Sequence, residues 1–115
     1  MPTDKHLVMY SRTFGCPFIS VAKQVLHDYG VDYQELFVDQ DETAKQRVLG
    51  WTGFLSVPTL VVATQGSILP YTEVDPLPAG ASPRGIDRGP MLTEANTAEL
   101  KAWLSKHGFI VDLQR

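Results

Sequence analysis

The chain has 115 residues, of which 43% are hydrophobic and 20% charged, and this composition is typical of one soluble domain with a single core. Its formal net charge of −3 gives no basic field for a phosphate backbone, so we expect no nucleic-acid partner. No apolar run approaches the ~20 residues of a membrane-spanning helix, and the N-terminus lacks the apolar block of a signal peptide. We therefore expect a cytoplasmic protein with no membrane partner, built as one domain over residues 1–115.

The first part of the chain predicts a β-α-β unit. Residues 6–10 (HLVMY) are apolar strand formers, and they end at the polar residues 11–13. From Pro17 the apolar residues recur at helical spacing until Gly30, a typical residue at a helix C-terminus. Residues 31–38 (VDYQELFV) then favour a second strand, which the helical crossover would place parallel to the first.

A shorter helix and a third strand follow. Asp39, with Glu42 three positions later, resembles a capping box and predicts a helix that ends near residues 50–53. Pro58 then opens an apolar strand over residues 59–63, because the first position of a strand tolerates the loss of an N–H group.

The last third combines a long loop with a final helix. Gln65 and Gly66 predict a hairpin turn into a brief antiparallel strand near residues 67–69. Proline and glycine are frequent over residues 69–92, which we expect to form an irregular loop. A capping box at Asn96 predicts a helix that continues to Gly108.

Together these elements predict an α/β domain with the order β-α-β-α-β-β-α. The expected architecture is a four-stranded mixed sheet flanked by three helices, with the long loop before the last helix.

Cys16 is the only cysteine of the chain, so it cannot form an internal disulfide. It could be a small buried residue, a thiol that works with an outside sulfur, or a ligand to a cluster shared between chains. Pro17 places it at the first turn of the predicted helix, where the helix dipole and unpaired N–H groups lower a thiol pKa from ~8.5 into the range of ~3.5–7.5. The nearby cation of Arg12 would add to this effect. The context favours a reactive thiolate over a buried structural cysteine.

Two motifs, YSRTFGCPF over residues 10–18 and SVPT over residues 56–59, resemble the glutaredoxin branch of the thioredoxin superfamily across about residues 5–69. The resemblance implies a thioredoxin-like fold, with Cys16 as the catalytic nucleophile and no metal. It also implies a cis Val57–Pro58 bond, whose loop clamps the backbone of the substrate. The residues that it assigns to substrate binding are Arg12, Phe14, Pro17, Phe18, Val57 and Pro58.

This chain departs from the family pattern in three places. Ile19 stands where dithiol members carry a second cysteine, so the resemblance implies a monothiol mechanism in which an external thiol releases the capped Cys16. Arg12 lies four residues before the cysteine, whereas the family's basic residue lies three before it. The Gly-Gly-Cys-Asp-like segment that binds glutathione has no match, and residues 70–90 stand in its place. We expect no tightly bound cofactor, with glutathione or another low-molecular-weight thiol as co-substrate and a small thiol or a disulfide-bearing protein as partner.

Two other functions stay open at this point. In an iron–sulfur carrier, two chains would each supply Cys16 and glutathione would complete the ligand set, although such members carry Cys-Gly-Phe-Ser in place of Cys-Pro-Phe-Ile. A redox-inactive binding module would keep the fold and use the groove at Pro58 to hold a protein. The sequence predicts no oligomeric state.

Overall fold

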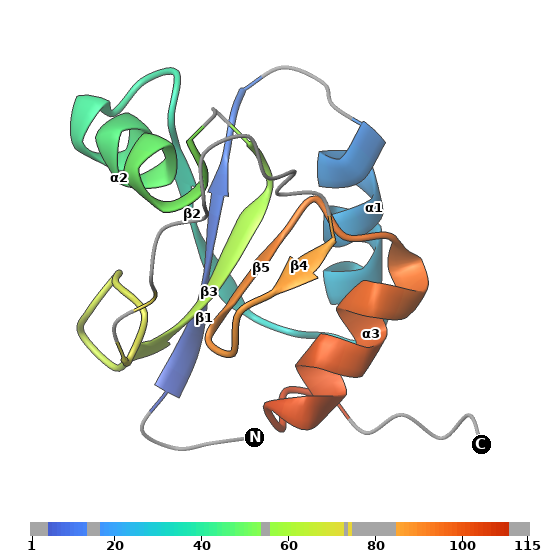
Figure 1. The fold of residues 1–115 in the computed structure, drawn as a ribbon. Helices are drawn as coiled ribbons and strands as arrows, with labels where there is room; N and C mark the ends of the chain where they lie inside the picture. The colour runs from blue at the N-terminus through green and yellow to red at the C-terminus, as the bar shows by residue number, and fades with distance from the viewer. Residues whose placement is uncertain (1–4, 14–16, 54–55, 73, 75–84, 111–115) are drawn as a thin grey trace.

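The computed structural model describes residues 5–13, 17–53, 56–72, 74 and 85–110, and these form three helices and five strands (Figure 1). The strands are β1 (Lys5–Ser11), β2 (Tyr33–Phe37), β3 (Thr59–Thr64), β4 (Ile86–Asp87) and β5 (Met91–Thr93). The helices are α1 (Pro17–Asp28), α2 (Glu42–Thr52) and α3 (Thr97–Lys106). Within the described residues, no helix has the length and apolarity needed to cross a bilayer.

The strands form one mixed sheet in the order β2-β1-β3-β5-β4. β1 and β2 run parallel, as the β-α-β prediction requires, and the remaining neighbours are antiparallel. Helices α1 and α3 cover one face of this sheet, whereas α2 covers the other (Figure 1). The expected α/β class with a mixed sheet and three helices is therefore confirmed, and it is consistent with a thioredoxin-like fold.

Each face of the sheet has its own hydrophobic cluster, because successive strand side chains point to opposite sides. The first core cluster lies beneath α1 and α3 and consists of Leu7, Met9, Ala22, Val25, Leu26, Val31, Leu60, Val62, Leu92, Ala95, Leu100, Trp103, Leu104, Phe109 and Ile110. The second core cluster lies beneath α2 and consists of Val8, Tyr10, Ile19, Val38, Ala44, Val48, Val57, Val61, Ala63 and Met91. Alternate residues of β1 and β3 thus contribute to both clusters.

The sheet has five strands and not the expected four, because the prediction of the fourth strand was wrong. Residues 67–69 follow the expected turn, but the structure has only an isolated bridge there, between Ala63 and Pro70. The strands that complete the sheet are β4 and β5, and all of β4 and the first two residues of β5 lie inside the stretch that we expected to be an irregular loop. The physical reason is that Gly89, at φ 75°, and the following Pro90 form the turn of a β4–β5 hairpin whose second strand pairs with β3. Residues 73 and 75–84 of that stretch lie outside the described residues.

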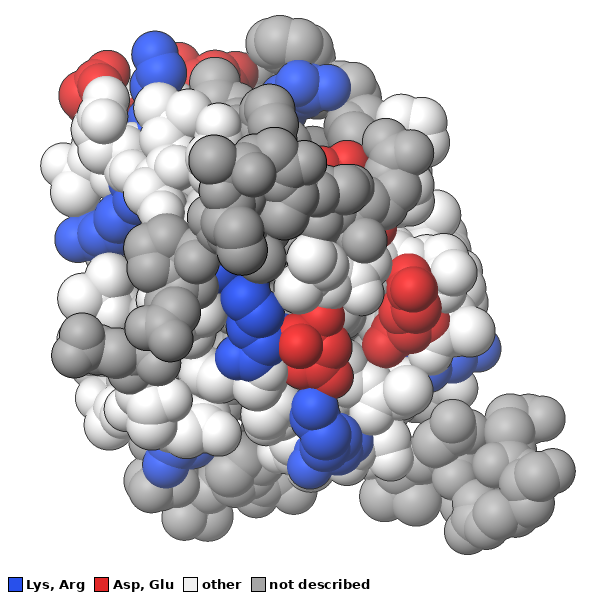
Figure 2. Space-filling view, viewed as in Figure 1, with Lys and Arg blue, Asp and Glu red and all other residues white. Residues whose placement is uncertain are grey.

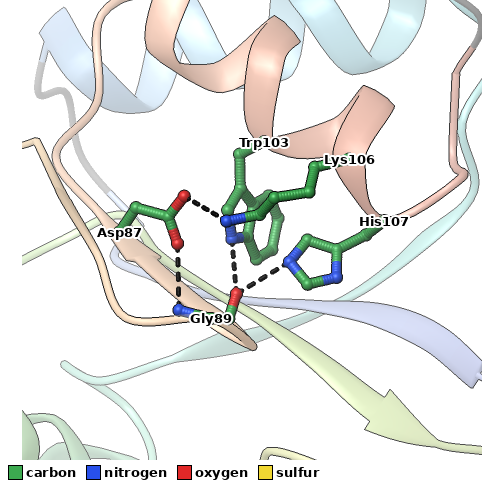
Figure 3. A network of polar contacts seen from close by, with 5 residues as sticks. All are labelled: Asp87, Gly89, Trp103, Lys106 and His107. Carbon is green, nitrogen blue, oxygen red and sulfur yellow. Dashed lines mark hydrogen bonds and ion pairs between the residues drawn. The ribbon is translucent and has the colours of Figure 1, made fainter.

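The hairpin is docked on α3 through the carbonyl group of Gly89 (Figure 3). This oxygen accepts a hydrogen bond from Trp103 Nε1 at 2.8 Å and lies 2.7 Å from His107 Nε2. The Asp87 carboxylate accepts from the Gly89 N–H group at 2.9 Å and pairs with Lys106 Nζ at 2.6 Å. Two side chains of α3 and the residue that follows it therefore hold the hairpin turn in place.

Of the two helix N-caps that the sequence predicted, one is confirmed and the other is displaced. The capping box of α3 is present as expected, with Asn96 and Glu99 exchanging side-chain and backbone hydrogen bonds. The N-cap of α2 is Asp41 and not Asp39, because Asp41 Oδ1 accepts from the N–H groups of Thr43 and Ala44. Asp39 makes a different contact, described below.

Candidate functional site

Three strands bring the motif residues to one end of the sheet. Tyr10 of β1 pairs with Thr59 of β3, which in turn pairs with Thr93 of β5. Since β3 runs antiparallel to both neighbours, the chain leaving β1, the chain entering β3 and the chain leaving β5 meet at this end. Arg12 and Pro58 therefore lie at the same end of the sheet.

The chain that leaves β1 leads through Cys16 into α1. Cys16 is bonded to Pro17, the first residue of α1, so the thiol-bearing residue directly precedes the helix as expected. Pro17 is exposed and Phe18 half-buried, whereas Phe14 and Cys16 lie outside the described residues.

Ile19, at the position of the second cysteine in dithiol members, is only 5% exposed. Its side chain belongs to the second core cluster, which also contains Val57. The first turn of α1 and the loop that enters β3 are thus held by the same apolar core.

The Val57–Pro58 peptide bond is cis, as the resemblance implies, and both residues are buried. Two hydrogen bonds support this loop, one from a side chain at its end and one from the backbone that follows β5. The Thr59 hydroxyl donates to the Ser56 carbonyl oxygen at 2.7 Å, and the Glu94 N–H group donates to the Pro58 carbonyl oxygen at 3.0 Å. The loop is therefore fixed both within itself and to the end of β5.

A pocket of about 480 Å³ opens beside this loop. It is lined by Arg12, Val38, Asp39, Gln40, Asp41, Glu42, Lys45 and Val57. Arg12 and Val57, both predicted substrate-binding residues, thus contribute to one cavity. The lining carries two cations and three carboxylates, so a ligand in this pocket would meet charges of both signs.

Asp39 ties the turn after β1 to the end of β2. Its carboxylate accepts from the backbone N–H group of Thr13, at 3.2 Å to Oδ1, and from the Thr13 hydroxyl. The hydrogen bond from the Thr13 hydroxyl is the main cause that lowers the pKa of Asp39, and the nearby charge of Arg12 also lowers it. Since the pKa is lowered, the stabilisation from this contact is present above about pH 4 and is lost as the pH falls through the lowered pKa.

Sequence reasoning missed Asp39 and Lys45 as pocket residues. The β-α-β pattern contained a signal for Asp39, because the carboxyl ends of two parallel strands lie at the same end of a sheet. Asp39 follows the second strand and therefore lies near the residues that follow the first. The capping-box interpretation concealed that signal. Lys45 lies in the first turn of α2, and only the position of that helix over the sheet brings it to the pocket.

Charges of both signs are interspersed on the face shown in Figure 2, with no continuous basic surface among the coloured residues. Among the residues that the structure describes, no group of three or more His, Cys, Asp or Glu side chains is placed to hold a metal ion.

Comparison with known proteins decides the family. A family model described as Glutaredoxin matches residues 7–66, which are 60 of the 115 residues. The chain belongs to the glutaredoxin family. The matched segment runs from β1 into the turn after β3, and it includes Arg12, Cys16 and the Val57–Pro58 loop. At a coarse level this membership supports a glutaredoxin-like thiol oxidoreductase. No curated protein matches the chain significantly.

Proposed function

We propose that this glutaredoxin acts by a monothiol mechanism, in which Cys16 exchanges thiols with mixed disulfides. The observation that carries the proposal is the position of the chain's single cysteine, directly before the first residue of α1. The N–H groups of a first helical turn have no partners within the helix, and with the helix dipole they stabilise a thiolate.

The proposed reaction has two exchange steps. In the first, the Cys16 thiolate attacks one sulfur of a disulfide, forms a new S–S bond and releases the other sulfur as a thiolate. In the second, the thiolate of an external low-molecular-weight thiol attacks the mixed disulfide and returns Cys16 as a thiolate. The external thiol and the released group leave as a new disulfide, so each S–S bond broken is replaced by one formed.

Ile19 explains why an external thiol is needed. A dithiol member would resolve the mixed disulfide with a second cysteine at this position, whereas here the side chain is apolar and buried in the second core cluster. Position 19 therefore contributes to packing, and the release of the substrate depends on a second molecule.

The pocket beside Val57 would hold the non-reacting part of the disulfide. Its volume of about 480 Å³ lies within the range of ~300–1,000 Å³ that is usual for small-molecule sites. In the proposed complex the Val57–Pro58 loop contacts the substrate backbone, and Pro17 and Phe18 border the sulfur from α1. Arg12 and Lys45 would contact a carboxylate of the substrate. Phe14, two residues before Cys16 in the sequence, completes the proposed set.

The test is reduction of a glutathionylated peptide by wild type and by Cys16→Ser, with glutathione as the external thiol. We expect the variant to lose the activity completely, because serine is not a competent nucleophile toward a disulfide. Ser20→Ala is the matched control, since Ser20 is exposed on α1, and this variant should retain the wild-type rate. Full activity in Cys16→Ser would overturn the proposal.

Two further measurements distinguish the alternative functions. Visible absorbance after anaerobic purification would favour the iron–sulfur carrier over thiol exchange. A thiol of Cys16 that stays unreactive toward oxidised glutathione at every pH would favour the redox-inactive module. A glutathione adduct on Cys16, detected by mass spectrometry, supports the proposed function.

A further inference from the structure

Arg88 links the turn of the β4–β5 hairpin to the C-terminal end of α2. Its Nη1 group donates to the Trp51 carbonyl oxygen at 2.8 Å, although the two residues are 37 positions apart in the sequence. We propose that Arg88 is a positioning residue, which holds the Val57–Pro58 loop in the geometry that binds the substrate backbone. This inference rests on the proposed thiol exchange at Cys16 and adds to it a residue that does not line the pocket.

The guanidinium group of Arg88 is held by its own hairpin. The Arg88 backbone N–H group donates to the Met91 carbonyl oxygen at 2.8 Å, and Nη2 lies 3.0 Å from Met91 Sδ. Met91 is fully buried in the second core cluster. Arg88 is half-buried, and a hydrogen bond from a partly desolvated cation is stronger than the same bond in water. Arg88 therefore ties Trp51 to a fixed part of the sheet.

Trp51 is held on two sides near the end of α2. Its ring packs edge-on against that of Tyr10, with the centroids 5.1 Å apart, and its carbonyl group accepts from Arg88. A cation at this end of a helix also interacts favourably with the helix dipole. The chain continues through Gly53, the C-cap of α2, to Val57, which is six residues after Trp51. The position of this helix end thus sets where the chain enters the loop.

The same hairpin supports the other side of the loop. The Thr59 and Thr93 hydroxyl groups lie 3.1 Å apart between β3 and β5, and the Glu94 N–H group donates to the Pro58 carbonyl oxygen at 3.0 Å. The hairpin therefore contacts the chain before the loop through Arg88, and the loop itself through the end of β5. Loss of the Arg88 side chain would keep the second connection and loosen the first. A loop that adopts its binding geometry less often binds the substrate backbone less well.

The test compares two uncharged disulfides, so a change in the field at the Cys16 thiolate alters both rates alike. The disulfide of N-acetylcysteine N-methylamide carries peptide N–H and carbonyl groups beside its sulfurs, whereas hydroxyethyl disulfide carries none. The rate of adduct formation on Cys16 is measured by mass spectrometry after acid quench. Each rate is divided by that of the same disulfide with N-acetylcysteine amide, a neutral model thiol. For wild type we expect a normalised preference for the peptide disulfide of about fivefold or more, because only this disulfide can form backbone hydrogen bonds with the loop.

Arg88→Met, which keeps most of the side-chain length and removes the donors, should reduce this preference by about threefold or more. The loss should fall on the peptide disulfide, and the rate with hydroxyethyl disulfide should stay near that of wild type. If Arg88→Met does not fold, Arg88→Gln replaces it with the same expectation, because the glutamine amide ends two bonds short of the guanidinium nitrogens.

The matched control is Lys106→Met. Lys106 of α3 pairs with Asp87 of the same hairpin at 2.6 Å (Figure 3). This variant removes a cation and a contact of the hairpin but leaves the link to α2 intact. It should keep the wild-type preference.

The outcomes separate the two proposals. If wild type forms an adduct with neither disulfide, the proposed thiol exchange fails, and the inference fails with it. The positioning role of Arg88 alone is overturned if adducts form but wild type does not prefer the peptide disulfide, if the Arg88 variant keeps the wild-type preference, or if both of its rates fall in equal proportion. Thermal unfolding of each variant verifies that the compared proteins are folded.

Discussion

Asp39 and Thr13 show how two exposed residues can organise the segment that carries the thiol. Thr13 lies three residues before Cys16, and its backbone and side chain both donate to the Asp39 carboxylate. Such a contact contributes little to global stability, because both groups are also well solvated in the unfolded chain. Its consequence is local, since it fixes the direction in which the chain leaves β1.

Asp39→Ala should therefore lower the reactivity of Cys16 while leaving the unfolding temperature nearly unchanged. We expect the exchange rate with hydroxyethyl disulfide, a neutral substrate, to fall by about threefold or more, because a less ordered turn holds the thiolate in a reactive geometry less often. The rate is compared at the high-pH plateau, where Cys16 is fully ionised in both proteins.

Glu42→Gln is the control for this experiment. Glu42 lines the same pocket, but its carboxylate accepts from Gln46 of its own helix and does not contact the turn. This variant removes a pocket charge and should keep the wild-type plateau rate. Equal plateau rates for Asp39→Ala and wild type would show that the contact with Thr13 does not position the thiol.

At the scale of elements, the sequence predicted helices better than the second half of the sheet. The first and last helices combine a regular apolar spacing with clear end signals, Gly30 after α1 and the Asn96–Glu99 box before α3. Those signals are local, so they can be read without the fold. The bounds of these helices were accordingly close to the prediction.

The β4–β5 hairpin could not be predicted in the same way. Its strands have two and three residues, too few for an alternating pattern, and Gly89 and Pro90 suggest a loop. What makes these residues a hairpin is pairing with β3 and docking on Trp103, which are contacts between distant parts of the chain. A single sequence shows neither contact.

The docking of this hairpin on α3 should make stability depend on pH. Burial is the main cause that lowers the pKa of His107, with a smaller effect of Lys106 in the same direction; the hydrogen bond to Gly89 and the charge of Asp87 oppose it. The unfolded chain therefore binds a proton at a higher pH than the folded chain. Stability is full above about pH 7 and declines as the pH falls below the ordinary histidine pKa of ~6.5.

His107→Gln tests this dependence, because glutamine keeps an N–H donor for the Gly89 carbonyl but does not titrate. Between pH 7.5 and pH 5, urea unfolding should show a smaller loss of unfolding free energy in this variant than in wild type. His27→Gln is the control, since His27 is exposed near the end of α1, and it should follow the wild-type curve. If His107→Gln lost as much unfolding free energy as wild type between pH 7.5 and pH 5, His107 would not be the titrating group.

At the scale of the whole molecule, the two core clusters are linked by the strands between them. Leu7 and Met9 of β1 belong to the first cluster, whereas Val8 and Tyr10 belong to the second. The sequence predicted helices on both faces of the sheet, but it did not assign the strand side chains to either cluster. It could not place the pocket residues relative to one another, because Arg12, Asp39 and Val57 meet only after the sheet has formed.

Because neither cluster can be exposed without breaking strands that also hold the other, the chain should unfold in one cooperative step, as is usual below about 150 residues.

The two tryptophans report on opposite faces of the sheet. Trp103 is buried in the first cluster, and Trp51 packs against the second, with its ring centroid 5.1 Å from that of Tyr10. Trp51→Phe leaves the first reporter and Trp103→Phe leaves the second. Trp103→Phe also removes the Nε1–H group that donates to the Gly89 carbonyl oxygen, so we expect the free energy of unfolding of this variant to fall by about 1–3 kcal/mol. In each variant the urea midpoint from fluorescence should equal the midpoint from far-ultraviolet circular dichroism, whereas separate midpoints would mean that the two faces of the sheet unfold independently.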